Sequence, residues 1–280
     1  MGKRSAMVID SHIHFYAAPR PGSVYTDAKD HLTFPEVLSQ ARSIGISKIV
    51  QVTPAAIGYD NDHSFEVAER HPDDVLGVIV RLDPFSPDID RTLRAALERP
   101  QMLALRLTLI DPHNVTALAD RTLDGFFERA HSLGVRIELF APFRVSETHE
   151  TVRRFPGIQW LIDHMGLRYY AGRDNTTSFR QWDQLLQLAE EPNAWIKCSY
   201  FPEAAADLDA YPYPVAQRHL QQLVEHAGAT RLVWGSNFPN VRRACTYRQA
   251  LDFVRVECDF LSETDRSALL GGNFLRYAGR

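Results

Sequence analysis

The sequence predicts an α/β protein, a single (β/α)8 TIM barrel that forms one domain over residues 1–280. Eight short β-rich runs start about 32 residues apart on average, and helical stretches lie between them. This alternation is typical of a parallel sheet built from βα units. A doubly wound open sheet is the structural alternative. It is less favoured because no GxGxxG follows the first run and no P-loop is present.

The expected strands share strand length and an enrichment in β-branched or aromatic residues. In chain order they are residues 7–10, 48–53, 76–81, 103–108, 135–140, 158–163, 194–199 and 231–236. The helical stretches are residues 34–45, 64–72, 124–134, 178–191 and 214–228, with 248–260 after the last strand. Gly45, Gly134 and Gly228 stand where three of them end, as glycine often does. Catalytic side chains are then expected at the C-terminal ends of the strands.

Composition excludes several functional classes. Of 280 residues, 45% are hydrophobic and 24% are charged, as in a soluble globular protein. No run approaches the ~18 apolar residues of a membrane span, and the start lacks the apolar stretch of a signal peptide. The net charge of −4 gives no electrostatic basis for nucleic-acid binding. Three cysteines without CxxC spacing suggest buried thiols. We therefore expect a cytoplasmic protein without nucleic-acid or membrane partners.

Histidines follow two of the expected strands. The first strand runs into His12 and His14, which share a face because residues two apart in an extended segment point the same way. Two imidazoles at the barrel mouth can bind a metal or polarise a carbonyl. His164 ends the sixth strand and is expected to face them. The loop after it carries Arg168, Tyr169 and Arg173, which would suit a planar, carboxylated ligand.

Arg106 lies inside an otherwise apolar strand, so it needs either an anionic substrate or an internal ion pair, for example with Glu138 of the next strand. Both interpretations stay open. Lys197 of the seventh strand has no assigned role. Asn237 stands in a turn after the eighth strand, between glycine and proline. An amide cannot act as a general base, but it can orient water or donate to an oxyanion.

These residues lie in motifs that resemble the amidohydrolase superfamily, and within it the amidohydrolase-2 branch of predicted TIM-barrel lactonases. The motifs are DSHIHFY at 10–16, LRLT at 105–108, LIDHMG at 161–166, WGSNFP at 234–239 and GGNFLRYAG at 271–279. The resemblance covers nearly the whole chain and implies a barrel of the metal-dependent-hydrolase type. It implies that His12, His14 and His164 bind a divalent metal or polarise a lactone carbonyl, and that Arg106 holds substrate.

The sequence departs from this family at two points. Asn237 falls where hydrolytic members usually have the aspartate that deprotonates water. The fifth strand lacks the histidine that many metal-dependent members have there, which leaves His12, His14 and His164 as metal ligands, with Glu138 as a fourth at most. A divalent site needs about three or four suitable ligands. We therefore expect no cofactor, with one divalent metal, zinc or manganese, as the alternative.

The favoured function is a hydrolase that opens a lactone or a related cyclic carboxyl compound. His12, His14, His164 and Asn237 are its expected catalytic residues. Its substrate is expected to be small and carboxylated, and to contact Arg106, Glu138 and the loop residues named above. Two alternatives stay open: a metal-dependent, non-oxidative decarboxylase, and an inactive binding protein of the same fold. A homo-oligomer is also left open.

Overall fold

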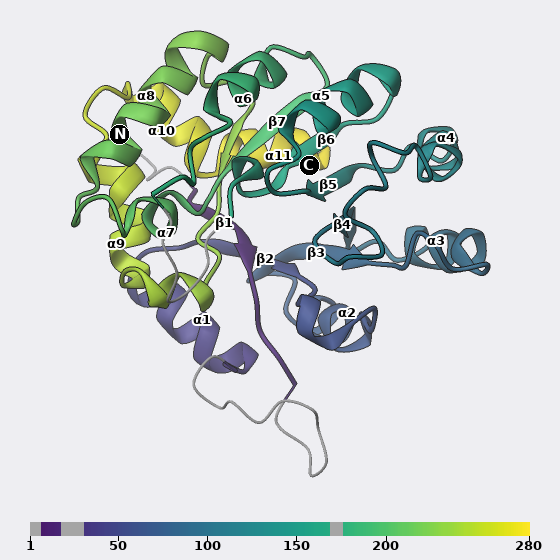
Figure 1. Ribbon diagram of the computed structural model, residues 1–280. Coiled ribbons are helices and arrows are strands. Elements are labelled where there is room, and N and C mark those ends of the chain that lie inside the picture. Colours follow the sequence, from purple (N-terminus) through teal and green to yellow (C-terminus); the bar gives the residue numbers. More distant parts are fainter. Residues whose placement is uncertain (1–6, 18–30, 169–175) are drawn as a thin grey trace.

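The computed structural model describes residues 7–17, 31–168 and 176–280. Eight parallel strands form one sheet in the order β1 to β8, and Figure 1 shows them alternating with helices. The strands are β1 Ile9–Ile13, β2 Lys48–Val52, β3 Val75–Arg81, β4 Met102–Thr108, β5 Ile137–Phe140, β6 Trp160–Ile162, β7 Ala194–Cys198 and β8 Leu232–Trp234. The predicted (β/α)8 barrel is confirmed.

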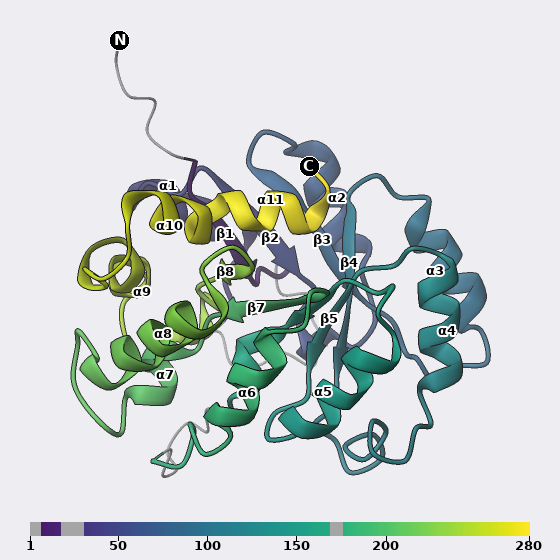
Figure 2. The same ribbon diagram turned by 90° about the horizontal axis from the view of Figure 1, so that it is seen from above.

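The helices lie around the outside of the strands (Figure 2). They are α1 Phe34–Ser43, α2 Asp62–Arg70, α3 Ile89–Leu97, α4 Asp124–Ser132, α5 Val145–Arg154, α6 Trp182–Ala189, α7 Phe201–Ala205, α8 Pro214–Ala227, α9 Tyr247–Asp252, α10 Glu263–Ser267 and α11 Asn273–Ala278. Short 3-10 or π turns are η1 Ala55–Ile57, η2 Asp163–Gly166, η3 Asn240–Arg243, η4 Phe253–Glu257 and η5 Ala268–Gly272. Each expected helical stretch overlaps an observed helix, although α2 and α9 begin one or two residues before the expected position. No helix of the described residues is long and apolar enough to cross a bilayer.

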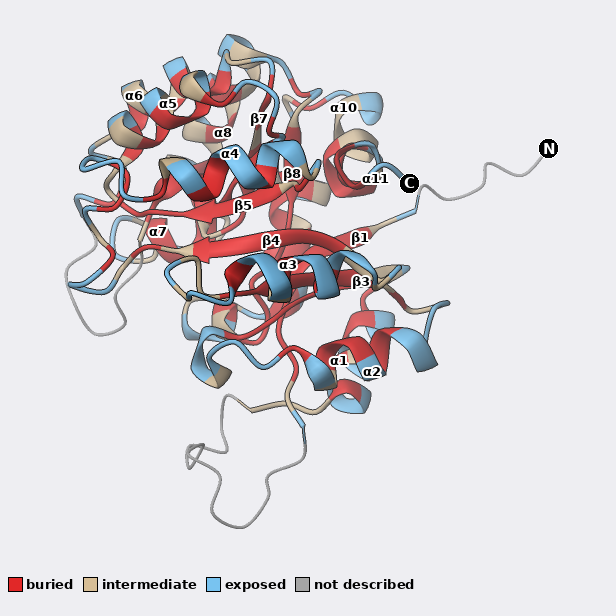
Figure 3. Cartoon of the chain, turned by 90° about the vertical axis from the view of Figure 1, so that its right-hand side faces the viewer, coloured by how far each residue is buried: buried red, intermediate tan, exposed pale blue. Residues whose placement is uncertain are grey.

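The core lies between the strands and the inner faces of the helices (Figure 3). In α3, for example, Ile89, Leu93 and Ala96 are buried at spacings of four and three residues, whereas the opposite face is exposed. Burying one such leucine stabilises the fold by about 1.5–3 kcal/mol. Strands covered on both sides leave only their ends for chemistry.

The backbone closes the barrel between β1 and the segment after β8. His14 N donates to Phe238 O at 2.8 Å, and Asn237 N donates to His12 O at 2.9 Å. Gly235 is required at this seam, because an added Cβ would lie 2.8 Å from His12 Cβ. These contacts bring the HxH pair and Asn237 together, although they are more than 200 residues apart in the chain.

Asp10 stabilises the same junction between β1 and the loop after β8. Its buried carboxylate accepts hydrogen bonds from Ser236 N at 2.9 Å and from the Tyr247 hydroxyl at 2.7 Å. Tyr247 in turn stacks on Phe238, with ring centroids 4.2 Å apart. The aspartate of the DSHIHFY motif therefore holds β1, the loop after β8 and α9 in one arrangement.

Candidate active site

A cavity of about 370 Å³ opens at the C-terminal ends of the strands. Four of the predicted site residues line it: His14 from β1, Arg106 from β4, His164 from η2 and Asn237 from the loop after β8. Other lining residues include Tyr16, His31, Thr108, Phe140, Tyr200, Asn240 and Arg243. The cavity is thus lined by guanidinium, imidazole and amide groups together with apolar side chains.

The HxH pair has defined hydrogen-bond partners. His14 Nδ1 lies 2.8 Å from Val52 O, which can only accept, so Nδ1 carries the hydrogen and Nε2 is bare. His12 Nε2 lies 3.3 Å from His14 Nε2. Burial lowers the pKa of His14 to about 4, with Arg106 adding to the effect, and burial lowers the pKa of His12 well below 6.5. Both rings are therefore neutral at pH 7.

His164 follows β6 in a strained backbone conformation. Its φ is 52° and that of Met165 is 57°, the left-handed region that non-glycine residues rarely adopt. The ring stacks on Tyr200 at 3.8 Å, and its Nδ1 lies 2.6 Å from Ser199 Oγ. Its Nε2 lies 3.3 Å from Asp163 Oδ2, and this nearby carboxylate favours the tautomer with the hydrogen on Nε2. Burial lowers the pKa of His164 well below 6.5.

Arg106 lines the cavity and is also held by two buried carboxylates. Its Nη2 donates to Asp163 Oδ2 at 2.5 Å, and its Nε lies 3.3 Å from Glu138 Oε1. Burial alone would raise the pKa of Asp163, but His164, Arg106 and other neighbouring groups lower it well below its usual range. The internal ion pair of Arg106 is therefore observed, with Asp163 as well as Glu138, and Arg106 also lines the cavity; its contact with an anionic substrate stays a prediction.

A second cation lies beneath the histidines. Lys197 of β7 is fully buried and forms an ion pair with Glu138. Its Nζ also donates to Ser11 O and lies 3.2 Å from His12 Nδ1. Burial, with Asp163 next, raises the pKa of Glu138 to about 7 despite this pairing. Because an ammonium can only donate, it favours the tautomer in which His12 Nδ1 accepts and Nε2–H points to His14.

Asn237 is held at both ends of its amide. It has a left-handed backbone with φ of 59°, and its side chain is 2% exposed. Its Nδ2 donates to Glu203 Oε1 of α7 at 3.3 Å, and its Oδ1 accepts from Asn240 Nδ2 at 3.3 Å. The amide nitrogen thus faces a buried carboxylate, while the oxygen lies on the side of cavity-lining Asn240.

The other predicted site residues lie elsewhere. Glu138 and His12 are fully buried behind the cavity wall and contact Arg106 and His14, respectively. Arg168 is half-buried and is not among the residues that line the cavity. Tyr169 and Arg173 lie outside the described residues. The substrate contacts expected of Glu138 and these loop residues stay predictions.

Sequence reasoning missed Asp163, Lys197 and Glu203 as parts of the site. Lys197 lies in an apolar strand, which is the signal that identified Arg106 and could have identified it too. Asp163 directly precedes His164 at a strand end, and that position also carries a signal. Glu203 lies in a stretch that resembles an ordinary exposed helix start, so nothing in the sequence singles it out.

The distances between some of these residues fit a divalent metal. Two nitrogen ligands at 2.0–2.1 Å in a tetrahedron lie roughly 3.4 Å apart, close to the 3.3 Å between His12 and His14 Nε2. His12, Asp163 and His164 also offer ligand atoms within 4.8 Å of one another. Among the described residues, Asp163 Oδ1 has no hydrogen-bond partner. It lies 3.2 Å from His12 Nδ1 and would accept from it if both Nε2 atoms bound a metal.

The charges around these ligands oppose tight metal binding. Lys197 and Arg106 already neutralise the two carboxylates, and Lys197 Nζ disfavours a hydrogen on His12 Nδ1. Asn237, in the loop after β8, is neutral and adds no negative charge to the site. A metal in this site would be held mainly by neutral imidazoles beside two fixed cations.

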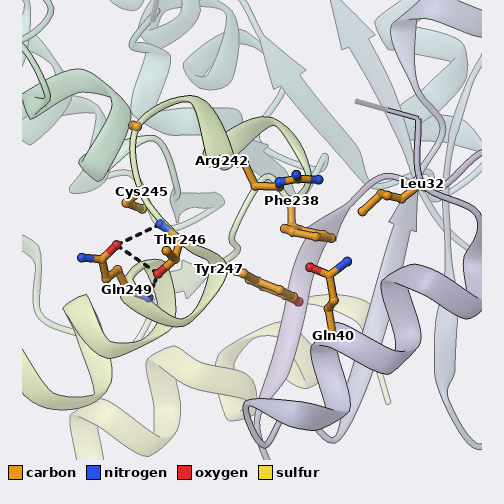
Figure 4. A pocket seen from close by; sticks show the side chains of 9 residues that line it. Leu32, Gln40, Phe238, Arg242, Cys245, Thr246, Tyr247 and Gln249 are labelled. Carbon is orange, nitrogen blue, oxygen red and sulfur yellow. Dashed lines mark hydrogen bonds between the residues drawn. The ribbon is translucent and has the colours of Figure 1, made fainter. Parts of the chain in front are cut away.

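A second cavity, of about 630 Å³, lies between α1 and the segment that leads into α9 (Figure 4). Phe238, Tyr247 and Gln40 lie across it, and Thr246 caps α9 by accepting from Gln249 N at 3.2 Å. The histidines do not line this cavity. It lies behind the Phe238–Tyr247 stack, and the candidate chemistry belongs to the smaller cavity.

Comparison with known proteins agrees with the fold and the motifs. A sequence profile of the amidohydrolase family matches residues 9–276. The chain therefore belongs to the amidohydrolase family, and the resemblance seen in its motifs is confirmed. No curated protein sequence matches it significantly.

Solved structures share the fold at low identity. A Burkholderia multivorans amidohydrolase with bound zinc is 19% identical, with a TM-score of 0.81 over 98% of this chain and 99% of that one. A candidate 2-pyrone-4,6-dicarboxylic acid hydrolase of Pseudomonas putida is 24% identical, with a TM-score of 0.74 over 98% of each chain. A 5-carboxyvanillate decarboxylase of Sphingomonas paucimobilis is 14% identical, with a TM-score of 0.67 over 98% and 99%. This likeness shows the fold alone.

Proposed function

We propose that the chain hydrolyses a lactone, or a related cyclic ester, that carries a carboxylate. One observation carries the proposal: His14, Arg106, His164 and Asn237 line the same cavity with complementary hydrogen-bonding roles. Arg106 and His164 Nε2–H are donors, whereas His14 Nε2 and Asn237 Oδ1 are acceptors. Ester hydrolysis needs donors for the carbonyl oxygen and acceptors for the attacking water.

The acceptors orient the water. The water replaces His12 Nε2–H at the single lone pair of His14 Nε2, a contact that is long at 3.3 Å. One hydrogen of the water then bonds to His14 Nε2 and the other to Asn237 Oδ1, which leaves an oxygen lone pair for the carbonyl carbon. As the C–O bond forms, His14 Nε2 takes the proton. Val52 O supports this step because it keeps the Nδ1 hydrogen in place and leaves Nε2 as the basic atom.

The donors stabilise the charge that develops. His164 Nε2–H and the Arg106 guanidinium face the carbonyl oxygen as it becomes an oxyanion, while the rest of the guanidinium holds the substrate carboxylate. The tetrahedral intermediate then expels the ring oxygen, which takes the proton from His14. The products balance as one hydroxy acid from one lactone and one water.

None of these steps requires a metal. A divalent ion held by His12, His14 and His164, with Asp163, would supply further polarisation of the carbonyl. The two fixed cations lead us to propose that the resting enzyme holds well under one equivalent of zinc or manganese. Metal-dependent decarboxylation is the second candidate function, because the nitrogen spacing of His12 and His14 fits the divalent metal that it needs.

A substrate panel tests the proposal. Purified protein is offered carboxylated lactones, their neutral esters and aromatic or muconate-type acids, and products are followed by NMR and by CO₂ release. We expect ring opening of carboxylated lactones that is lost in His14→Ala. CO₂ release without ring opening would replace the proposal with decarboxylation. Folded protein that converts neither class would indicate a binding protein.

A further inference from the structure

Glu203 is an unusual residue for its position. It lies in α7, is 1% exposed and is separated from the cavity by Asn237, to which its Oε1 is bonded at 3.3 Å. Among the described residues, no cation forms an ion pair with it and its Oε2 has no hydrogen-bond partner. An isolated buried carboxyl group costs free energy, so the fold alone gives no reason for glutamate here.

The contact of Glu203 determines which way Asn237 points. The amide nitrogen of Asn237 donates to Glu203 Oε1, and above the Glu203 pKa of about 7 this carboxylate can only accept hydrogen bonds. Asn240 Nδ2 donates to the amide oxygen from the cavity side. The backbone of Asn237 is fixed as well, since its N–H donates to His12 O. Rotation of the amide by 180° would place its oxygen against Glu203 and lose both side-chain bonds.

We propose that Glu203 is a positioning residue, which holds the Asn237 amide so that its oxygen faces the attacking water. The inference rests on the proposed hydrolase function and assigns a reason for asparagine after β8. A carboxylate at position 237 would lie against Glu203 at about the same distance as the present hydrogen bond, and the two groups would repel wherever both are ionised. Asn237 and Glu203 therefore form one matched pair. The carboxyl group lies on Glu203, behind Asn237, and not at position 237 on the cavity wall.

Four variants test the pair. Glu203→Leu removes the acceptor and should lower kcat by at least about tenfold with a much smaller change in KM, because water is misplaced while substrate binding is kept. Glu203→Gln keeps an acceptor oxygen and should recover most of that loss. Asn237→Asp should be poorly active, whereas Asn237→Asp combined with Glu203→Gln should exceed it by at least about tenfold, because the glutamine amide can donate to the introduced carboxylate. Exposed Glu225→Leu is the control for loss of a carboxylate.

The Tm of thermal unfolding tests the interaction between Asn237 and Glu203 without any substrate. At pH 8 and one scan rate, Asn237→Asp should lower Tm by at least roughly 2–4 °C, and adding Glu203→Gln should restore it. If Tm falls in Asn237→Asp and recovers with Glu203→Gln but the wild type opens no lactone, the proposed hydrolase function is wrong. The contact between Asn237 and Glu203 then has a structural role only. If the wild type is active and Glu203→Leu matches it in kcat, or if the two aspartate variants are equal in both assays, the positioning role is wrong.

Discussion

Lys197 Nζ lies 3.2 Å from His12 Nδ1, so a fixed cation contacts the buried side of the histidine pair. This contact favours the His12 tautomer whose Nε2–H points to the bare Nε2 of His14. A metal between the two Nε2 atoms would require the other tautomer, with the hydrogen on Nδ1. Lys197 and a divalent ion therefore compete through the ring of His12.

Removing this cation should improve metal binding. In Lys197→Met combined with Glu138→Gln, both members of the buried ion pair are neutral, so no carboxylate is left unpaired. Zinc affinity, measured by competition with a chromogenic chelator, should rise at least about tenfold over the wild type, which corresponds to about 1.4 kcal/mol. Arg91→Met combined with Asp88→Asn, which removes an exposed ion pair, is the matched control. An unchanged affinity would show that Lys197 does not set the His12 tautomer.

His14→Ala should lower kcat/KM for a carboxylated lactone by about 10²-fold, because the acceptor for the water proton is lost. Its Tm should stay within a few degrees of the wild type, since the side chain lies on the cavity wall. His113→Ala, at an exposed position, is the matched control and should retain full activity. Near wild-type turnover in His14→Ala would mean that His12 and His14 have a structural role only.

Arg106→Lys separates charge from geometry at the substrate carboxylate. An ammonium cannot reproduce the planar guanidinium contacts, so KM for a carboxylated lactone should rise roughly tenfold more than KM for its neutral ester. Steady-state kinetics on the two matched substrates gives this ratio, with exposed Arg91→Lys as the control. Equal increases for both substrates would mean that Arg106 acts only through Asp163 and Glu138.

The stability of the protein should depend on Glu203 and pH together. Burial raises the pKa of Glu203 from 4.5 to about 7. The folded form therefore keeps the proton where the unfolded form has lost it, and stability falls as pH rises from about 4.5 to 7, by about 1.4 kcal/mol per pH unit from this group. Glu203→Gln abolishes the effect, so its Tm relative to wild type should increase between pH 4.5 and pH 8. Glu225→Gln should show no such trend, and a constant Tm difference for Glu203→Gln would contradict the pKa shift.

The strand and helix pattern predicted the barrel because each βα unit carries its own local signals. The eight apolar runs all became strands, with boundaries shifted by a few residues; for instance the run at 158–163 became the shorter β6, because Asp163 turns away into η2. The HxH spacing predicted a shared face, and the two Nε2 atoms do converge. Periodicity and motif position suffice for these features.

The electrostatic surroundings of the site could not be predicted in the same way. Asp163, Lys197 and Glu138 meet only because β5, β6 and β7 are neighbours in the closed sheet, and their pairing depends on side-chain direction. The contact between Glu203 and Asn237 joins a short helix to a loop after another strand. Such contacts are set by tertiary packing, and no local sequence pattern reports them.

The most direct test of the account is the rate of lactone opening by one preparation before and after metal depletion. Wild-type protein is dialysed against chelator, its zinc and manganese contents are measured, and hydrolysis of a carboxylated lactone is followed by NMR. We predict well under one equivalent of metal at the start and a rate that changes less than about twofold after depletion, in keeping with a barrier lowered by His14, His164 and Arg106. One equivalent of metal, with activity lost on depletion and regained when zinc or manganese is added back, would contradict the account.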